Sequence, residues 1–230
     1  MIAMAKKKES TLINMLVALF VITAVSGGVL GLVYGMTKDA IAEVDQKKNE
    51  AAIKAVLPLT GEVTFRADTL RWSGEDGKEL LFPCSLALDA NNRLQGAAIK
   101  TSEGGFGGNI DLMVGILADG TIKGVSVLSH SETPGLGANM TGKFKDQFTD
   151  KKPGDNFILE VTKDHGKEPQ KVDAITAATI TSRAFTKAVD KAYQAFEAIK
   201  VNYLNNTPAG NAVPATEGTN ESTEGGNDHE

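Results

Sequence analysis

A long segment without a charged residue, from Thr11 to Thr37, constrains this chain more than any other feature. Leucine, isoleucine, valine, alanine and phenylalanine dominate it. A helix of about 20 apolar residues is enough to cross the hydrocarbon core of a bilayer, which is roughly 30 Å thick. This segment is longer than that, and a buried globular helix rarely lacks every charge. Residues 11–37 therefore predict a transmembrane anchor.

A cleavable signal peptide is the main alternative for an apolar segment so close to the N-terminus. The apolar core of such a peptide spans about 7–15 residues and is followed by small residues. Ser26, Gly27 and Gly28 are small, but apolar residues continue beyond them as far as Val33, so we interpret the segment as an uncleaved anchor. The segment contains no cysteine that could carry a lipid, which excludes a lipoprotein anchor.

Three lysines, residues 6–8, stand directly before the anchor and predict its orientation. Positively charged flanks of a membrane span stay in the cytoplasm, so residues 1–10 are expected to form a basic cytoplasmic head. Lys38, Lys47 and Lys48 follow the anchor, but acidic residues accompany them. The rest of the chain is then expected on the periplasmic or extracytoplasmic side of the cytoplasmic (inner) membrane.

The charge and the cysteine content exclude several classes of function. A single cysteine, Cys84, excludes an intramolecular disulfide framework and any metal or iron–sulfur site built from cysteines alone. The formal net charge of −5 argues against nucleic acid as a partner, because phosphate binding needs clustered Lys and Arg. The five acidic residues after Lys200 have no Lys or Arg among them. Residues 205–230 are therefore expected to form a disordered acidic tail.

Between the anchor and the tail, the residue patterns predict one α+β domain, residues 59–204. Before it, residues 38–58 predict a helical stalk that ends at Pro58. Residues 61–100 predict short strands with Gly and Asn turns, and residues 109–129 predict a β-hairpin with Asp119-Gly120 at its turn. A further strand is expected over residues 156–162. A long helix with one apolar face is expected last, from about Ser182.

Three segments of the domain carry candidate binding residues. Residues 104–108 are rich in glycine, which allows a ligand to approach the backbone but equally suits a mobile turn. Residues 130–137 contain a Pro-Gly pair that predicts a type II turn, which could simply be solvated. Residues 173–182 place several hydroxyl groups before the last helix, where Thr181 or Ser182 would be a good N-cap. A helix N-terminus of this kind also favours a phosphate, because its free amides and its dipole attract anions.

Residues in these segments match motifs of a known family. Asp173-x-x-Thr176-Ala177-Ala178-Thr179 resembles the flavinylation motif Asp-x-x-(Ser/Thr)-Gly-Ala-Thr of the FMN-binding domain family. Residues 132–137, Glu-Thr-Pro-Gly-Leu-Gly, match the second signature of that family, and residues 105–110 resemble its glycine-rich lead-in. The anchor and stalk look most like those of the G subunit of the Rnf complex, an ion-translocating ferredoxin:NAD⁺ oxidoreductase. One departure is Ala177, where the family usually has Gly; a methyl group there disfavours positive φ.

The resemblance implies a covalently bound FMN. In the family, a separate flavin transferase, using FAD and Mg²⁺, joins the FMN phosphate by a phosphodiester to the last threonine of the motif, which is Thr179 here. Asp173 and Thr176 would serve recognition by the transferase or shape the loop, and Glu132, Thr133 and Leu136 would contact the isoalloxazine ring. His130 is left as a turn residue. The cofactor-binding residues expected on this basis are Asp173, Thr176, Ala177, Ala178, Thr179, Glu132, Thr133, Gly135, Leu136 and Gly137.

The resemblance further implies electron transport, with no catalytic residue and no metal site in this chain. The protein would pass electrons between redox centres of neighbouring subunits while the complex translocates Na⁺ or H⁺. Its partners would be the other membrane and peripheral subunits, the flavin transferase and membrane lipid.

Two alternatives to this function stay open. One is the same flavin domain in the C subunit of the Na⁺-translocating NADH:quinone oxidoreductase or in a stand-alone extracytoplasmic flavoprotein. The other is a membrane-anchored assembly module without a cofactor.

Overall fold

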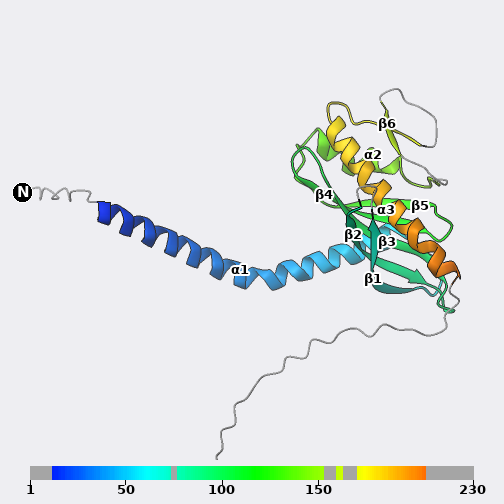
Figure 1. Cartoon of the computed structure of the whole chain (residues 1–230), viewed down its shortest axis with the longest axis horizontal. Helices are drawn as coiled ribbons and strands as arrows, with labels where there is room; N and C mark the ends of the chain where they lie inside the picture. The colour runs from blue at the N-terminus through cyan, green and yellow to red at the C-terminus, as the bar shows by residue number, and fades with distance from the viewer. Residues whose placement is uncertain (1–11, 74–76, 153–158, 163–169, 206–230) are drawn as a thin grey trace, which may run out of the picture.

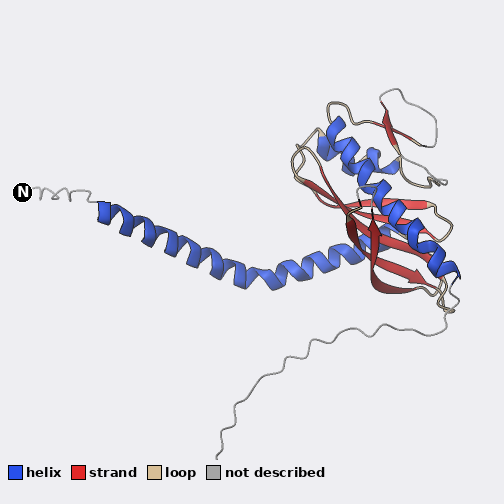
Figure 2. Cartoon of the chain, in the orientation of Figure 1, coloured by secondary structure: helices blue, strands red, loops and turns tan. Residues whose placement is uncertain are grey.

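The computed structural model describes residues 12–73, 77–152, 159–162 and 170–205 (Figure 1). Two long helices, α1 and α3, flank an antiparallel sheet, and the α+β class is therefore confirmed (Figure 2). The predicted head and tail and residues 156–158 of the predicted strand lie outside the described residues. In chain order the elements are α1 (Leu12–Val56), β1 (Thr64–Ser73), β2 (Glu79–Leu88), β3 (Leu94–Gly104), β4 (Asn109–Leu117), β5 (Ile122–Ser129), a 3₁₀ helix η1 (Gly137–Thr141), α2 (Lys143–Asp146), β6 (Glu160–Thr162), β7 (Lys171–Asp173) and α3 (Thr179–Asn205).

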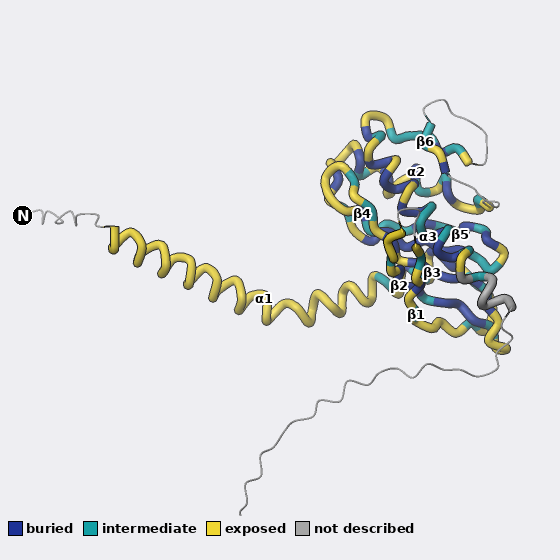
Figure 3. Tube along the Cα trace, viewed as in Figure 1, coloured by how far each residue is buried: buried dark blue, intermediate teal, exposed yellow. Residues whose placement is uncertain are grey.

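Helix α1 is continuous from Leu12 to Val56, so it runs through both the anchor and the stalk segments. Its apolar part is wholly exposed on the isolated chain (Figure 3) and is long and apolar enough to cross a membrane. The helix ends shortly before Pro58, whose ring does not fit a helix interior. Its buried residues, Ala52 and Val56, lie in the last turns. These turns form its contact with the domain.

Strands β1 to β5 form one antiparallel sheet in the order of the sequence. The predicted hairpin is confirmed as β4 and β5, with Gly120 at positive φ in its turn. Because successive side chains of a strand point to opposite faces of a sheet, each face has a core of its own. On β4, Leu112 and Val114 face one core and Met113 faces the other. The short strands β6 and β7 form a separate parallel pair.

Helix α3 packs across one face of this sheet, chiefly against β3 (Figure 1). Its apolar residues recur at helical spacing and are buried as predicted, with Phe185 and Phe196 fully enclosed. The ring of Phe185 also lies 5.2 Å from that of Phe144 and 5.1 Å from that of Phe148, measured between centroids. These three rings hold α2 and the residues after it against the first turns of α3.

The last turns of α1 pack on the opposite face of the sheet. Gly115 of β4 allows this close approach, because a Cβ atom there would overlap the carbonyl group of Val56. A second, smaller core forms at this contact. Its buried members are Ala52, Val56, Leu57, Ala87, Ala98, Met113 and Leu128.

The start of α3 corrects one prediction. The helix begins at Thr179 and not near Ser182. Its first internal hydrogen bond runs from Ser182 N–H to Ala178 O, at 3.0 Å. The predicted N-cap role was therefore wrong for both Thr181 and Ser182, which lie inside the first turn. The hydroxyl of Ser182 instead accepts a hydrogen bond from Ile175 N–H at 2.9 Å, and so it ties the preceding loop to the helix from within.

Candidate functional site

A cavity of about 370 Å³ opens where the β3–β4 loop, the segment after β5 and the first turn of α3 meet. Its volume is at the lower end of the range for ligand pockets, about 300–1,000 Å³. The motifs in the sequence predict seven of its ten lining residues; Phe106, Ile180 and Thr181 are the additions. The full lining is Phe106, Glu132, Thr133, Leu136, Gly137, Ala177, Ala178, Thr179, Ile180 and Thr181.

The first turn of α3 brings backbone amides to this cavity. Because the helical ladder starts at Ser182 N–H, the amides of Thr179, Ile180 and Thr181 precede it and have no carbonyl partner within the helix. Such amides, together with the helix dipole, form a site that favours phosphate and other anions. Thr179 is the first helical residue and is half-buried. Its hydroxyl group therefore belongs to the same wall as the free amides.

The loop before α3 reverses direction at Ala177, whose φ is +60°. Ala178 N–H donates to Ile175 O at 3.0 Å and closes a turn around residues 176 and 177. A side chain disfavours this left-handed conformation, because Cβ crowds the following carbonyl oxygen. The motif that this loop resembles has glycine at the same position, and the observed φ gives the physical reason for that preference.

Glu132 is a buried carboxylate that joins the three walls of the cavity. Its Oε1 accepts hydrogen bonds from Phe106 N–H at 2.7 Å and from Gly107 N–H at 3.1 Å. Its Oε2 accepts one from Thr181 Oγ1 at 2.8 Å. These three donors offset the cost of burying the charge, since 5% of the residue is exposed. The carboxylate thus shapes the cavity, and its contact with a bound ring stays a prediction.

Residues 133–136 form a type II turn, as the Pro134-Gly135 pair predicts. Leu136 N–H donates to Thr133 O at 3.2 Å, and Gly135 has the positive φ, +77°, that this turn requires at its third residue. Before the turn, the Nδ1 atom of His130 accepts a hydrogen bond from the backbone N–H two residues further on. Gly135 sits at the tip of the turn and is not one of the lining residues.

Three large apolar side chains surround the cavity and remain exposed. The exposed fractions are 70% for Phe106, 56% for Ile180 and 42% for Leu136. Sequence reasoning missed Phe106 and Ile180, although one signal was present. Phe106 stands among four glycines, so neighbouring side chains cannot enclose it, and an aromatic residue in such a loop suggests contact with a ligand or a partner.

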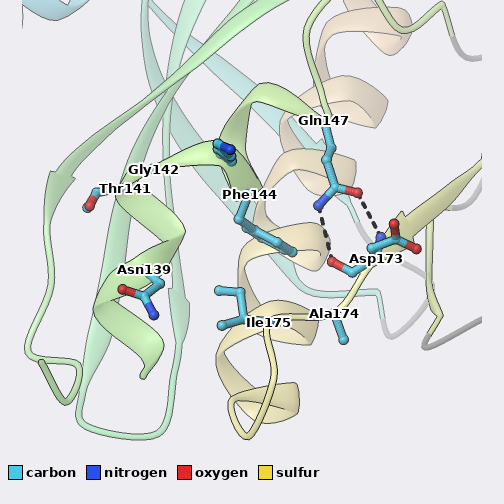
Figure 4. A pocket seen from close by; sticks show the side chains of 9 residues that line it. Asn139, Thr141, Gly142, Phe144, Gln147, Asp173, Ala174 and Ile175 are labelled. Atoms are coloured by element: carbon cyan, nitrogen blue, oxygen red, sulfur yellow. Dashed lines mark hydrogen bonds between the residues drawn. The ribbon is translucent and has the colours of Figure 1, made fainter. Parts of the chain in front are cut away.

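Asp173 and Thr176, the other predicted motif residues, are not part of this cavity. Asp173 lines a second cavity of about 540 Å³, together with Phe144, Ile175 and their neighbours (Figure 4). The side-chain amide of Gln147 accepts a hydrogen bond from Asp173 N–H at 2.8 Å and donates one to Asp173 O at 3.1 Å (Figure 4). Thr176 is exposed on the loop. The two ends of the motif therefore face different surroundings.

The groups in the cavity suit the binding of an anion attached to an apolar ring. Free amides and a hydroxyl group at the start of α3 suit the anion, and the exposed apolar side chains suit the ring.

Cys84 lies apart from the cavity, buried in the sheet. Burial raises the pKa of its thiol to about 12, so the thiol stays protonated at neutral pH. Within the described ranges, no group of three or more His, Cys, Asp or Glu side chains could hold a metal ion.

A family model described as an FMN-binding domain matches residues 105–194 of the chain. This range contains every residue that lines the cavity. The match therefore covers the cavity together with most of α3.

Relatives with assigned names are similar over most of the chain. The G subunit of the Na⁺-translocating ferredoxin:NAD⁺ oxidoreductase complex of Acetobacterium woodii is 34% identical over 187 residues, which cover 78% of this chain and 88% of the relative. The G subunit of the proton-translocating ferredoxin:NAD⁺ oxidoreductase complex of Clostridium ljungdahlii is 31% identical over 193 residues, which cover 83% of this chain and 95% of the relative.

Among solved structures, the crystal structure of NqrC from Shewanella oneidensis is similar in fold. The TM-score is 0.55 at 16% sequence identity, and the match covers 70% of this chain and 99% of that chain. At this identity the likeness supports the fold alone.

Proposed function

The chain belongs to the family of G subunits of ion-translocating ferredoxin:NAD⁺ oxidoreductase complexes, and from this we propose that it carries electrons in such a complex through FMN attached to Thr179. One observation carries the proposal. The hydroxyl of Thr179, the free amides at the start of α3 and the exposed apolar side chains share one cavity, and this cavity lies inside the FMN-binding match. The family assignment favours the G subunit over the C subunit of the quinone reductase.

The residues of the cavity fit the two chemically different parts of FMN. The amides of Thr179, Ile180 and Thr181 would hold the phosphate, because they lack helical partners and lie at the positive end of the helix dipole. Phe106 and Leu136 would contact the ring, since both line the cavity and both are exposed. When bound, the flavin supplies one- and two-electron redox chemistry that the protein tunes through hydrogen bonds and local charge.

Covalent attachment at Thr179 requires a single phosphoryl transfer. The Oγ atom of Thr179 would form a bond to the flavin-side phosphorus of FAD, the bond between the two phosphates would break, and AMP would leave together with the hydroxyl proton. A separate flavin transferase with Mg²⁺ would catalyse this step. A cofactor outside the cytoplasm is difficult to replace, and a covalent bond prevents its loss.

The proposal places the flavin domain outside the cytoplasm. Residues 11–37 of α1 would span the membrane, residues 38–58 would form the stalk, and residues 59–204 would form the domain. The three lysines before the span support this orientation, because positive flanks stay in the cytoplasm. The two relatives are named for different ions, Na⁺ and protons, so the proposal covers a complex that translocates either ion.

Thr179→Ala tests both the cofactor and its site. We expect the full chain, coexpressed with a flavin transferase, to give a flavin-fluorescent band on a denaturing gel and a mass gain of one FMN less water. The peptide that contains Thr179 should carry this gain. The Thr179→Ala chain should give neither signal, because it lacks the oxygen that forms the phosphodiester.

Thr149→Ala is the matched control. Thr149 is exposed and belongs to neither the cavity nor the motif, so this variant should still accept the flavin at residue 179. The proposal fails if fluorescence survives Thr179→Ala, or if the unaltered chain is never modified. The second outcome would instead support a membrane-anchored assembly module without a cofactor.

A further inference from the structure

The loop that leads to Thr179 begins at Asp173, the last residue of β7. On one side β7 pairs with β6, where Ala174 N–H donates to Thr162 O at 2.8 Å. Because the backbone groups of consecutive strand residues point to opposite sides, those of Asp173 point away from β6. Within the described residues, β6 is the only strand that pairs with β7. The start of the loop therefore needs a partner of another kind.

The side chain of Gln147 takes the place of a neighbouring strand. Its Oε1 accepts a hydrogen bond from Asp173 N–H at 2.8 Å, and its Nε2 donates one to Asp173 O at 3.1 Å (Figure 4). A primary amide offers an acceptor and donors together, so it satisfies both backbone groups as a peptide group would. The two residues are 26 positions apart in the chain. The contact is therefore made by tertiary folding, outside the motif itself.

Gln147 is itself fixed to the helix that carries Thr179. It stands between Phe144 and Phe148, which are both buried and whose rings both pack against the ring of Phe185. Thr179 and Phe185 belong to the first two turns of α3. The two ends of the loop are thus held in one frame, the last residue by α3 and the first residue by Gln147.

The loop between these two ends has a conformation that needs support. Ala177 has a positive φ, which a side chain disfavours, and strained backbone persists only where its surroundings hold it. The hydrogen bond from Ile175 N–H to Ser182 Oγ supports the second half of the loop. Gln147 supports its start. Without this contact the loop could relax, and the surroundings of the Thr179 hydroxyl group would change.

We infer that Gln147 is a positioning residue for the attachment of FMN to Thr179. This inference rests on the proposed function and adds to it a residue that belongs to neither motif. In the attachment step, Thr179 Oγ bonds to the flavin-side phosphorus of FAD, the bond between the two phosphates breaks, and AMP leaves with the hydroxyl proton. Gln147 would contact none of these atoms, because it lines the second cavity and not the one at Thr179. It acts through Asp173, by keeping the loop in the shape that the transfer requires.

Gln147→Glu tests this role with almost no change of side-chain shape. At neutral pH the carboxylate still accepts from Asp173 N–H, but it has no donor and places an oxygen against Asp173 O. The full chain in detergent would be incubated with a flavin transferase, FAD and Mg²⁺, and attachment would be followed by flavin fluorescence on denaturing gels. We expect the rate at saturating chain concentration to fall about 10- to 100-fold, because a small misplacement of a reacting group has effects of this size. The half-saturating concentration of the chain should stay the same.

Gln147→Met is the second variant. It keeps the length of the side chain but removes both hydrogen bonds to Asp173, so a loss of the same order is expected. Both variants would be compared with the unaltered chain at a temperature at which circular dichroism shows each of them fully folded. A loss of stability alone would then leave the rate unchanged.

Lys151→Met is the matched control, because it acts on the same edge of the same strand. Lys151 Nζ donates a hydrogen bond to Lys171 O at 3.3 Å, two residues before Asp173. This variant removes a contact with β7 but leaves the contact of Gln147 with the loop in place. It should accept the flavin at the original rate.

Three results would overturn the inference: unchanged rates in both Gln147 variants, a loss confined to the half-saturating concentration, or an equal loss in Lys151→Met. The unaltered chain reports the proposed function separately, through the mass of its peptide that contains Thr179. If this peptide gains no FMN, both proposals fail. If it gains FMN and the Gln147 variants react at the original rate, only the role of Gln147 is refuted.

Discussion

At Ala177 the chain holds a methyl group in a backbone conformation that glycine adopts more easily. This strain lies two residues before Thr179, at the wall of the cavity. Nearby, Glu132 satisfies both of its oxygens with donors from two other segments. At the scale of single residues, the site is therefore a strained turn supported by a buried, hydrogen-bonded carboxylate.

Ala177→Gly should stabilise the protein. Removing Cβ relieves roughly 1–2 kcal/mol of left-handed strain, and the greater backbone freedom of glycine in the unfolded chain offsets about half of this gain. We expect the free energy of unfolding to rise by about 1 kcal/mol. Urea unfolding of the full chain in detergent, followed by the fluorescence of the single tryptophan, Trp72, would measure it.

Ala195→Gly is the opposite control, since Ala195 is fully buried in the interior of α3. There the same substitution adds backbone freedom without relieving strain, and it should lower stability by about 1 kcal/mol or more. An equal loss in both variants would show that position 177 is not strained.

At the scale of elements, α3 does two different things along its length. Its first turn forms a wall of the cavity, and the following turns bury an apolar face on the sheet. Lys187 and Lys191 of α3 form ion pairs with Glu103 at the end of β3. Their Nζ atoms lie 2.9 and 2.6 Å from the carboxylate oxygens of Glu103. The helix is thus fixed to the sheet by packing and by charge, and its N-terminus is held at the cavity.

A buried acid on the other side of α3 should make stability depend on pH. Asp190 faces β6 in a cavity of about 230 Å³ that Glu160, Arg183 and Lys187 also line. Burial raises its pKa to about 6, and a hydrogen bond from the Leu159 backbone opposes this only in part. Its Oδ2 accepts from the side-chain amide of Gln194 at 2.8 Å. Within the described residues its Oδ1 is buried without a hydrogen-bond partner.

The sign of this effect follows from the two pKa values of Asp190. The folded state binds the proton below about pH 6, whereas an unfolded aspartate binds it only below about pH 4. The free energy of unfolding should therefore rise as the pH falls from about 6 to about 4. In Asp190→Asn this contribution is absent, and the variant should gain stability at neutral pH. Melting temperatures across this pH range would measure both effects.

Asp146→Asn serves as the comparison for that series. Asp146 is exposed at the end of α2, so this variant should follow the pH profile of the unaltered chain. A parallel profile for Asp190→Asn would contradict the assignment of the effect to Asp190.

At the scale of the whole molecule, one sheet lies between two long helices that serve different purposes. Helix α3 completes the domain on one face, while the end of α1 seals the other face and continues into the candidate membrane span (Figure 1). The contact of α1 with the sheet involves a glycine that has no room for a side chain. The domain is therefore seated closely on its stalk.

Gly115→Ala should loosen this seating. The added methyl group would overlap the carbonyl of Val56, and overpacking of this kind costs about 1–3 kcal/mol. We expect the last turns of α1 to detach more often and trypsin to cleave faster after Lys54, an exposed residue in those turns. The time course of limited proteolysis, read by mass spectrometry, would show this.

Gly124→Ala is the matched control, because Gly124 pairs with Gly115 across β4 and β5. A methyl group there would lie 3.6 Å from Val56 Cα, an ordinary contact, so cleavage after Lys54 should stay at its original rate. Equal acceleration in both variants would indicate a general weakening of the hairpin.

Local patterns were sufficient to predict the hairpin, the turns and the last helix, whereas η1, α2 and β7 were not predicted, and the residues that line the cavity were expected from the family motifs. The alternation in residues 109–129, the Pro134-Gly135 turn and the apolar face of α3 involve neighbours along the chain, and the structure confirms them. The exact start of α3 was not predictable in this way. Several hydroxyl residues compete for the cap, and the bond from Ile175 to Ser182 depends on how the whole loop closes.

The amino-acid order was enough to establish the uncharged segment of α1, the α+β class and the two motifs whose residues mostly reach one cavity. Only the folded chain shows that Glu132 meets the amide of Phe106 and the hydroxyl of Thr181, which are 26 and 49 residues away. The fold also places Asp173 in a different cavity from the other residues of its motif. The difference is one of range. Helices, strands and turns arise from interactions over a few residues, whereas a cavity and its orientation arise from the packing of segments that are distant in the chain.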